Sequence, residues 1–193
     1  MTTKKPDYMI LVNGENRLPD NFEDTVEIIW VEIAIGEKYQ IEKKTYEAFL
    51  NLRKDLLEND GIQAELISVY RTIEQQTATF DNYVNKFGYE FAKTYAALPG
   101  HSEHHTGFAF DMSFLQNGEL PRGVQGLLGV DNLFQIAHKK LHKYGFILRY
   151  PKGKEDITKI GYEPWHMRYI DSPQIAKEIY DKGICFEEYF EQK

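Results

Sequence analysis

Apolar residues recur every three or four positions in several parts of the chain, which predicts helices. The stretch 43–59 carries such a stripe and is followed by Gly61, a common helix stop. Thr72 and Gln75 form a capping-box pattern, so a second helix is expected from there to about Phe87. Further helices are expected at 89–98, at 131–144 with Asp131 as its cap, and at 172–182. The expected buried faces are Tyr46, Phe49, Leu50, Leu56 and Leu57; Ile73, Phe80, Tyr83, Val84 and Phe87; and Leu133, Ile136, Ala137, Leu141 and Tyr144.

Strands are expected where β-branched and aromatic runs replace that spacing, at 9–12, 25–35, 64–70, 146–151 and 162–170. After Gly107 the period changes to two, so alternate residues should face opposite sides of a sheet. A turn is expected at Asn13 and Gly14, a loop at 115–130, and a polar connection at 152–161. Helices and strands without strict βαβ alternation favour an α+β fold, with a mostly antiparallel central sheet flanked by helices. The face with Phe108, Phe110, Met112 and Phe114 should enter the core, opposite Ala109, Asp111 and Ser113.

Composition narrows the class of protein. A chain of 193 residues with 42% hydrophobic residues fits one domain with a full core, spanning 1–193. The net charge of −7, without a basic cluster, argues against binding to nucleic acid or to an anionic membrane. The single cysteine, Cys185, excludes an internal disulfide and a cysteine-rich zinc site.

The N-terminal sequence contains only a four-residue apolar run, "MILV", which is too short for the core of a signal peptide. No run of about 18 apolar residues offers a membrane span. A cytoplasmic location is therefore expected, although a trimmed form of an exported protein would have the same sequence. Nothing in the sequence indicates an obligatory protein partner.

The stretch "HSEHHTGFAFDMSF" gathers three of the six histidines and is followed by an aspartate on the predicted strand. His104 and Asp111 flank the turn at Gly107, so both side chains can point to one place. A carboxylate on an otherwise apolar strand needs a positive partner, and a metal ion is one. Hydrolytic zinc takes three protein ligands and leaves one position for water, and "YEPWH" offers His166 as the third ligand, with Glu163 as a base.

Other interpretations of these residues carry less weight. Ser102, His104 and Asp111 invite comparison with a catalytic triad, but the nucleophile-elbow pattern is absent and the Ser–His spacing is awkward. His101 and His105 have no spacing that demands a function. The remaining pair, His138 and His142, has ligand spacing on a helix but no acidic partner nearby, so both are expected on a solvated helix face.

Two ordered motifs carry a family resemblance. "SEHHTGFAFD" matches S-x-H-x-x-G-x-A-x-D and "EPWH" matches E-x-W-H, and together they resemble the VanY and VanXY type of zinc D,D-peptidases in peptidase family M15. "YRTIEQQ", "GFILRYPKGKEDIT" and "LVNGENRLP" agree with further segments of that family. The resemblance covers about residues 11–170, followed by a helical segment at 171–193. Val69 and Lys159 depart from it, since the family commonly has glycine at both positions.

The resemblance implies that His104, Asp111 and His166 bind one Zn²⁺ ion in a cleft over the sheet. It implies that Glu163 is the general base and acid. Arg71, with Gln76 and Ser102, would bind the terminal carboxylate of the substrate or polarise its scissile carbonyl. The fork of an arginine side chain suits both tasks, because it can bind both oxygens of a carboxylate.

The implied reaction is hydrolysis of the C-terminal D-Ala of peptidoglycan precursors, or of D-Ala-D-Ala itself. An L,D-carboxypeptidase or a cell-wall endopeptidase would use the same motifs, and a non-catalytic peptidoglycan-binding module would keep the fold. A metal-free binding protein is a further alternative. A dipeptidase also needs an acidic partner for the free amine of its substrate. The sequence offers Glu119, Asp131 and Glu155 for this role without choosing among them.

Overall fold

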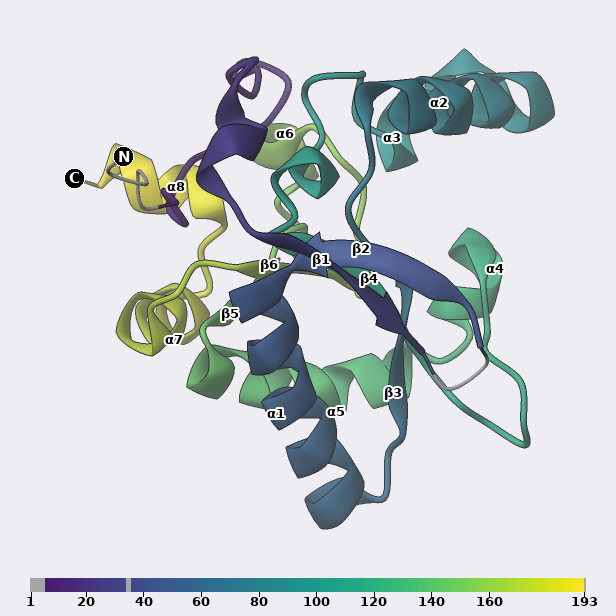
Figure 1. Ribbon diagram of the computed structural model, residues 1–193, viewed down its shortest axis with the longest axis vertical. Helices are drawn as coiled ribbons and strands as arrows, with labels where there is room; N and C mark the ends of the chain where they lie inside the picture. The colour runs from purple at the N-terminus through teal and green to yellow at the C-terminus, as the bar shows by residue number, and fades with distance from the viewer. Residues whose placement is uncertain (1–5, 34–35, 193) are drawn as a thin grey trace.

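A four-stranded antiparallel sheet in the order β3-β4-β6-β5 forms the centre of an α+β fold (Figure 1). The computed structural model describes residues 6–33 and 36–192 of the chain. A second sheet of two antiparallel strands, β1 and β2, crosses in front of the first in this view. The strands are β1 (Ile28–Glu32), β2 (Lys38–Glu42), β3 (Ala64–Ser68), β4 (Ala109–Phe114), β5 (Phe146–Leu148) and β6 (His166–Tyr169). The helices are α1 (Lys43–Asp60), α2 (Ile73–Phe87), α3 (Tyr89–Tyr95), α4 (Gly123–Leu128), α5 (Asp131–Leu141), α6 (Glu155–Thr158), α7 (Pro173–Lys182) and α8 (Phe186–Glu191), with short 3₁₀ turns η1 (Phe22–Thr25), η2 (Glu103–Thr106) and η3 (His142–Tyr144).

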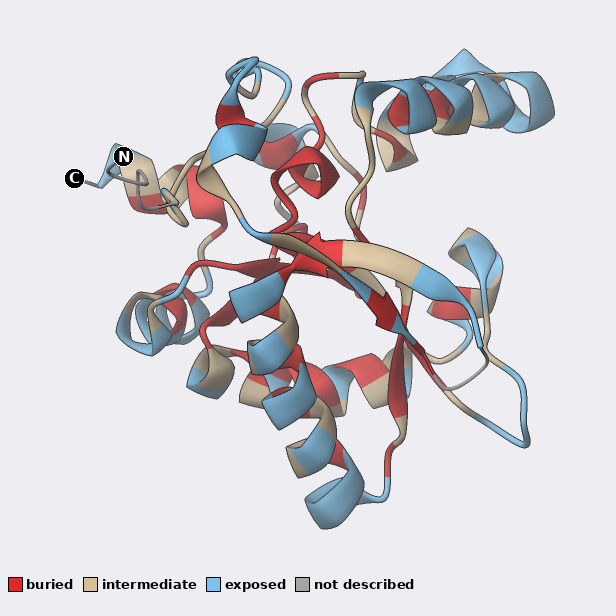
Figure 2. Ribbon diagram, viewed as in Figure 1, coloured by how far each residue is buried: buried red, intermediate tan, exposed pale blue. Residues whose placement is uncertain are grey.

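The hydrophobic core lies between one face of the central sheet and helices α1 and α5, and the strands of the central sheet are the most continuously buried part of the ribbon in Figure 2. Phe110 of β4 packs edge-on against Phe49 of α1 and Phe146 of β5, and Phe114 packs against Phe134 of α5. The alternation predicted for β4 is therefore confirmed on its apolar side. Each fully buried side chain of this size contributes about 1.5–3 kcal/mol to the hydrophobic stabilisation.

Local signals set the limits of the long helices. The carboxylate of Glu42 accepts hydrogen bonds from the backbone N–H groups of Lys44 and Thr45 at the start of α1, and Gly61 ends the helix in the left-handed conformation. The capping box predicted at Thr72 and Gln75 is present at the start of α2. The helix expected at 172–182 is also confirmed, as α7.

The predicted apolar faces were only partly right. Ile73 and Phe87 of α2 are 45% and 58% exposed, whereas Gln76 is buried. This helix covers the cleft and not the main core, so its inward face carries a polar residue. On α5, the fully buried aromatic is Phe134, which the sequence prediction omitted.

Several expected boundaries were wrong. Residues 9–12 form no strand, the loop predicted at 115–130 contains α4, and the connection at 152–161 contains α6. Asp131 is the first residue of α5 but does not cap it, because its carboxylate accepts a hydrogen bond from the Tyr162 hydroxyl. Strand β2 was not anticipated. Helix α8 lies within the helical segment expected at 171–193, although the one helix with stated bounds there was 172–182. The end of the strand expected at 25–35 includes residues 34–35, which lie outside the described residues.

Within residues 6–33 and 36–192, no helix combines the length and the apolar character that crossing a membrane requires.

Candidate metal centre and substrate cleft

Strand register places two of the expected metal ligands side by side. Asp111 of β4 is the direct antiparallel partner of His166 at the start of β6. On its other side Asp111 faces Ser68 of β3, after a break in the register between Leu66 and Ser68. The residues on this face of β4 are small apart from Asp111, so the carboxylate stands in a gap above the sheet, opposite the apolar core.

The third residue, His104, comes from the η2 turn just before β4. Ser102 caps this turn, and its hydroxyl accepts a hydrogen bond from the His104 backbone N–H at 3.3 Å. Gly107 ends the turn with φ of 74°, where an added Cβ would lie 2.7 Å from the Ile28 side chain. A larger residue at this position would be strained and would clash, so glycine is required for the turn that presents His104.

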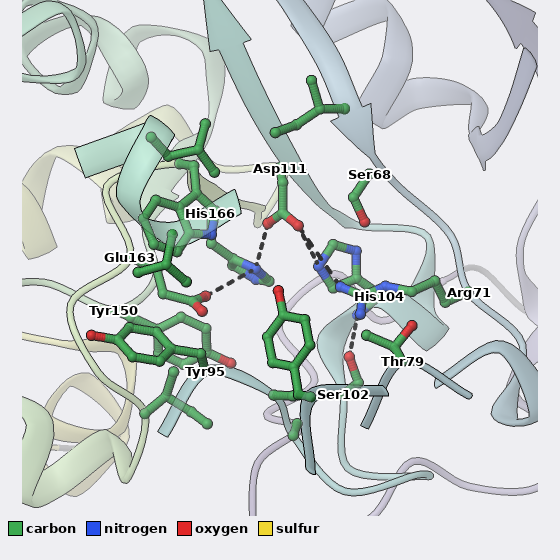
Figure 3. A pocket seen from close by; sticks show the side chains of 18 of the residues that line it. Ser68, Arg71, Thr79, Tyr95, Ser102, His104, Asp111, Tyr150, Glu163 and His166 are labelled. Carbon is green, nitrogen blue, oxygen red and sulfur yellow. Dashed lines mark hydrogen bonds and ion pairs between the residues drawn. The ribbon is translucent and has the colours of Figure 1, made fainter. Parts of the chain in front are cut away.

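The donor atoms of the three residues converge (Figure 3). One donor atom from each of His104, Asp111 and His166 lies within 4.8 Å of the other two. Asp111 stands between the two rings, with Oδ2 at 3.5 Å from His104 Nε2 and Oδ1 at 3.1 Å from His166 Nδ1. A set of two imidazoles and one carboxylate fits a zinc ion with an open fourth position.

Hydrogen bonds select which ring nitrogen can serve as a ligand. His104 Nδ1 lies 2.6 Å from the Val69 carbonyl and donates to it, which leaves the Nε2 lone pair facing Asp111. The Val69 side chain packs in the core and is not among the residues that line the cavity. In His166, Nδ1 faces Asp111, while Nε2 points away from the cluster toward Glu103.

Burial and charge set the proton affinities of this cluster. Burial, together with the nearby Arg71, lowers the pKa of His104 to about 4. Burial also acts to lower the pKa of His166, but Asp111 and Glu103 outweigh it and raise the value to about 9. Burial opposes ionisation of Asp111, yet the two histidines hold its pKa well below the usual range. The carboxylate is therefore ready to bind a cation, whereas His166 must release its Nδ1 proton first.

Glu163 lies in the tight turn that leads into β6. Its Oε2 is 3.7 Å from His166 Nδ1, and the side chain is 7% exposed. Burial raises the pKa of Glu163, with His166 opposing the shift. A carboxylate of raised pKa beside a metal cluster is suited to taking up and returning a proton.

Arg71 occupies the side of the cluster opposite Glu163 (Figure 3). One guanidinium nitrogen donates to Gln76 Oε1 at 2.8 Å, and another lies 3.8 Å from Asp111 Oδ2. Gln76 donates in turn to the Ala97 carbonyl at 2.7 Å. His105, for which the sequence suggested no function, donates from Nδ1 to the Arg71 carbonyl at 2.7 Å and so holds the backbone of this residue.

A cavity of about 240 Å³ joins these groups. All seven residues singled out from the sequence line it, namely Arg71, Gln76, Ser102, His104, Asp111, Glu163 and His166. Tyr83, Tyr95, Tyr150 and Trp165 supply aromatic walls, and Arg122 adds a cation. Among the described residues, Asp111 and Glu163 are the acidic side chains of this lining, and Glu119, Asp131 and Glu155 lie outside it.

Sequence reasoning missed the buried ion cluster behind His166. Glu103 pairs with Arg149 and Arg168, and both arginines are fully buried. A charged residue in the apolar runs "FILRY" and "HMRYI" was the available signal, since a buried charge requires a partner. The solvated position expected for His138 was wrong. This residue is 7% exposed, and its Nε2 donates to the Pro164 carbonyl at 2.8 Å.

Comparison with known proteins identifies the family. Residues 38–172 match the family described as VanY, D-alanyl-D-alanine carboxypeptidase. The chain belongs to the VanY family. It is therefore a peptidase of the carboxypeptidase type, and both motifs of the cleft lie inside the matched region.

Two curated relatives match nearly the whole chain. The putative carboxypeptidase YodJ of Bacillus subtilis is 40% identical over 99% of this chain and 70% of its own length. A D-alanyl-D-alanine carboxypeptidase of Enterococcus faecalis is 32% identical over 94% of this chain. This chain spans 65% of the length of the Enterococcus faecalis protein.

Solved structures agree with the VanY assignment in fold. A VanY D,D-pentapeptidase mutant in complex with Zn(II) has a TM-score of 0.77 at 29% identity, over 95% of this chain and 98% of that chain. The LD-carboxypeptidase LdcB has a TM-score of 0.79 at 39% identity, over 96% and 87% of the two chains. The Zn(II) complex and the His–Asp–His cluster together support zinc as the metal.

Proposed function

We propose that this protein is a zinc-dependent carboxypeptidase that removes the terminal D-Ala from a peptidoglycan peptide. The observation that carries the proposal is the convergence of His104, Asp111 and His166 in a cavity that also contains Glu163 and Arg71. In this proposal the three converging residues hold a single zinc ion. When bound, the zinc would supply Lewis acidity and a water molecule that ionises near neutral pH.

Glu163 is the proton carrier in the proposed reaction. Its carboxylate accepts the proton of the attacking water and returns it to the leaving amine when the peptide bond breaks. Its position beside His166, in a turn held by the hydrogen bond from the Glu163 N–H to the Tyr150 carbonyl, supports this role. The buried surroundings favour the protonated acid and so assist the first transfer, in which Glu163 takes up the proton of the water.

Arg71 binds the terminal carboxylate of the substrate or stabilises negative charge on the scissile carbonyl oxygen. The hydrogen bond to Gln76 aims the guanidinium into the cavity, and its Nε is buried without a partner among the described residues. Ser102, at the base of the same cavity, offers a hydroxyl to the substrate. Gln76 thus acts mainly by orienting Arg71.

The cavity favours a peptide over the free dipeptide as substrate. A dipeptide carries an ammonium group next to the scissile bond, and burying it requires a counter-charge. Within the described part of the chain, the acids that line the cavity are Asp111 and Glu163, which the reaction itself uses. An acylated substrate has no such ammonium group.

An L,D-carboxypeptidase is the second candidate. LdcB, named as an LD-carboxypeptidase, has 39% sequence identity to this chain and a TM-score of 0.79. VanYB, solved with D-Ala-D-Ala, has 29% sequence identity to this chain. VanXYg, solved with a phosphinate analogue of D-Ala-D-Ala, has 28%. D,D- and L,D-carboxypeptidases would use the same zinc chemistry. The two activities differ in the stereochemistry of the residue before the scissile bond.

One experiment tests these assignments together. Zinc-loaded protein is incubated with D-Ala-D-Ala, an N-acylated pentapeptide ending in D-Ala-D-Ala, and a tetrapeptide ending in an L,D bond, and the products are resolved by mass spectrometry. We expect release of one D-Ala from the pentapeptide and little cleavage of the dipeptide. Cleavage confined to the tetrapeptide would favour the L,D activity. Hydrolysis of the pentapeptide at an unchanged rate by Glu163→Gln would contradict the role of Glu163.

We also propose that residues 1–193 act as one peptidase domain. Support comes from segments outside the matched region. The Tyr8 and Ile10 carbonyls accept hydrogen bonds from Arg168, and Glu187 of α8 pairs with Arg149.

A further inference from the structure

A cluster of buried charges lies directly behind His166, on the side away from the cavity. Glu103 Oε1 accepts hydrogen bonds from Arg149 Nε at 2.8 Å and from an Arg168 terminal nitrogen at 2.7 Å. The side chains of these three residues are fully buried. One oxygen of the Glu103 carboxylate is thus held by two guanidinium groups, which fixes the direction of the other oxygen.

That other oxygen faces a metal-site histidine. Glu103 Oε2 lies 3.6 Å from His166 Nε2. Among the described residues, both atoms are buried and neither has a hydrogen-bond partner. A donor and an acceptor that face each other across a gap slightly longer than a hydrogen bond can pair after a small shift of the ring. Leaving them unpaired would cost the desolvation of both groups without a hydrogen bond to offset it.

We propose that Glu103 is a positioning residue, which accepts a hydrogen bond from His166 Nε2 and thereby turns Nδ1 toward the metal. This inference rests on the proposed function, because it assigns a metal to Nδ1. A carboxylate behind a metal-binding histidine fixes the tautomer and the orientation of the ring and raises its basicity as a ligand. The His104 ring is oriented in the same way, by the hydrogen bond from its Nδ1 to the Val69 carbonyl. Each ring is thus held through the nitrogen that faces away from the cluster.

The rest of the cluster keeps Glu103 charged and in place. Arg149 makes two parallel hydrogen bonds with Glu187 of α8, at 2.8 and 2.6 Å. Arg168 donates to the Tyr8 and Ile10 carbonyls at 3.0 and 2.8 Å. Two carboxylates therefore balance two guanidinium groups. Burial by itself would raise the pKa of Glu103, but Arg149 and Arg168 hold it well below its usual range.

Strand register explains how so much charge fits behind the site. Arg168 is the cross-strand partner of Ala109, the small residue on the cavity side of β4. Arg149 follows β5, and its backbone N–H donates to the His166 carbonyl at 3.3 Å. The cluster thus joins η2, β5, β6, α8 and the N-terminal segment at one metal-site residue. Buried ion pairs stabilise a fold weakly, because desolvation offsets their attraction, so orientation of His166 is the better account of this cluster.

The test compares Glu103→Gln with Glu65→Gln. Glu65 is also a buried carboxylate paired with an arginine, Arg53, but it has no contact with the cavity, so it is the matched control. Zinc affinity is measured by chelator competition, and metal geometry by the visible absorption of the Co²⁺-substituted proteins. We expect Glu103→Gln to weaken zinc binding about 10- to 100-fold and to change the Co²⁺ spectrum. Glu65→Gln should leave both unchanged, even if it lowers the unfolding temperature.

At saturating zinc, kcat of Glu103→Gln should fall while KM for the pentapeptide changes less than about twofold, since Arg71 is untouched. A folded Glu103→Gln protein with wild-type zinc affinity and Co²⁺ spectrum would overturn the proposal.

A second measurement uses the wild-type protein, in case Glu103→Gln does not fold. Nitrogen NMR of ¹⁵N-histidine-labelled, zinc-loaded protein reports which His166 nitrogen carries a proton. We expect a protonated Nε2 and a metal-shifted Nδ1. Metal on Nε2 would overturn the role of Glu103 while leaving the zinc site intact. If zinc shifted neither His166 nor His104, the proposed metal site would itself be wrong, and the role of Glu103 would fall with it.

Discussion

Side chains along the six residues of β4 point alternately to two faces, one in the core and one at the cavity, and the two faces have different roles. One face places Phe110, Met112 and Phe114 in the core against α1 and α5, all of them at most 1% exposed. The other face presents Asp111 to the cavity, between the small residues Ala109 and Ser113. The first face stabilises the sheet through apolar contacts that need no particular partner atom. The second depends on the direction of individual nitrogen and oxygen atoms.

This difference indicates that stability and activity can be separated by substitutions only one residue apart. Core contacts tolerate small shifts, because dispersion and burial are not directional. A metal cluster does not tolerate them, because its ligands must keep their distances and orientations. The four predictions below test the contrast, from the largest expected effect to the smallest.

The largest effect is expected on the cavity face. Asp111→Asn replaces the carboxylate that lies between His104 and His166 by a neutral amide. We expect loss of tightly bound zinc and of detectable pentapeptide hydrolysis, while the near-UV circular dichroism stays that of the wild-type fold. Elemental analysis after dialysis, together with the peptidase assay, checks both points. Full activity of a zinc-free Asp111→Asn protein would contradict the assignment of the metal site.

A substitution at the neighbouring residue, Phe110, should lower the stability of the fold and leave zinc binding and activity unchanged. Phe110→Ala leaves a cavity among Phe49, Phe146 and the rest of the core, and we expect a loss of about 3–5 kcal/mol in the free energy of unfolding. The folded fraction should still bind zinc and hydrolyse the pentapeptide at a rate near that of the wild type. Urea denaturation followed by fluorescence gives the stability. Loss of zinc binding in the folded Phe110→Ala protein would show that the two faces are coupled.

A smaller effect is expected at the edge of the cleft. Gln76→Ala removes the acceptor that orients Arg71 and leaves the metal cluster unchanged. We expect kcat/KM for the pentapeptide to fall about 10- to 100-fold, a loss of about 1.4–2.7 kcal/mol in transition-state stabilisation. Zinc affinity should not change. Thr79→Ala, on the same cavity-lining side of α2, is the control and should retain near wild-type kinetics.

The smallest effect is expected in the pH dependence of the folding stability, and it comes from the buried residue His138. Burial lowers the pKa of His138, which donates to the Pro164 carbonyl next to Glu163. Above pH 6.5 the ring is neutral in both the folded and the unfolded chain. As the pH falls below 6.5, the unfolded chain takes up the proton first, so the folded state loses up to about 1.4 kcal/mol per pH unit.

His138→Gln lacks this titration. Its stability deficit relative to the wild type should therefore shrink between pH 7 and pH 5. Parallel urea titrations at several pH values measure the difference. A deficit that stays constant over this range would contradict a buried, neutral His138.

Much of the fold followed from local patterns. Helices α1, α2 and α7 begin and end near the expected residues, because Gly61 and the capping residues Thr72 and Ser172 act within one turn of the chain. The pattern failed where tertiary packing decides exposure, as at Ile73 and His138. Helix α8 lies in the helical segment expected at 171–193, but no local pattern indicated that it supplies Glu187 to the buried cluster.

The sequence also determined the candidate chemistry. Two ordered motifs singled out His104, Asp111, Glu163 and His166, and the structure gathers all of them in one cavity. Motif spacing can do this because each motif lies within about ten residues and takes its conformation from a local turn and strand. Even Lys159, which departs from the family pattern, keeps the left-handed backbone (φ of 61°) that makes glycine common at this position.

Only the tertiary structure decided how the metal-site residues are held. Glu103 occupies a variable position inside the first motif, yet nothing local connected it to His166, which lies 63 positions later. Their approach depends on the pairing of β4 with β6, and on Arg149 and Arg168, whose charges are balanced by Glu103 and Glu187. Strand register and charge balance are properties of the assembled chain, because the partners come from segments far apart in the sequence.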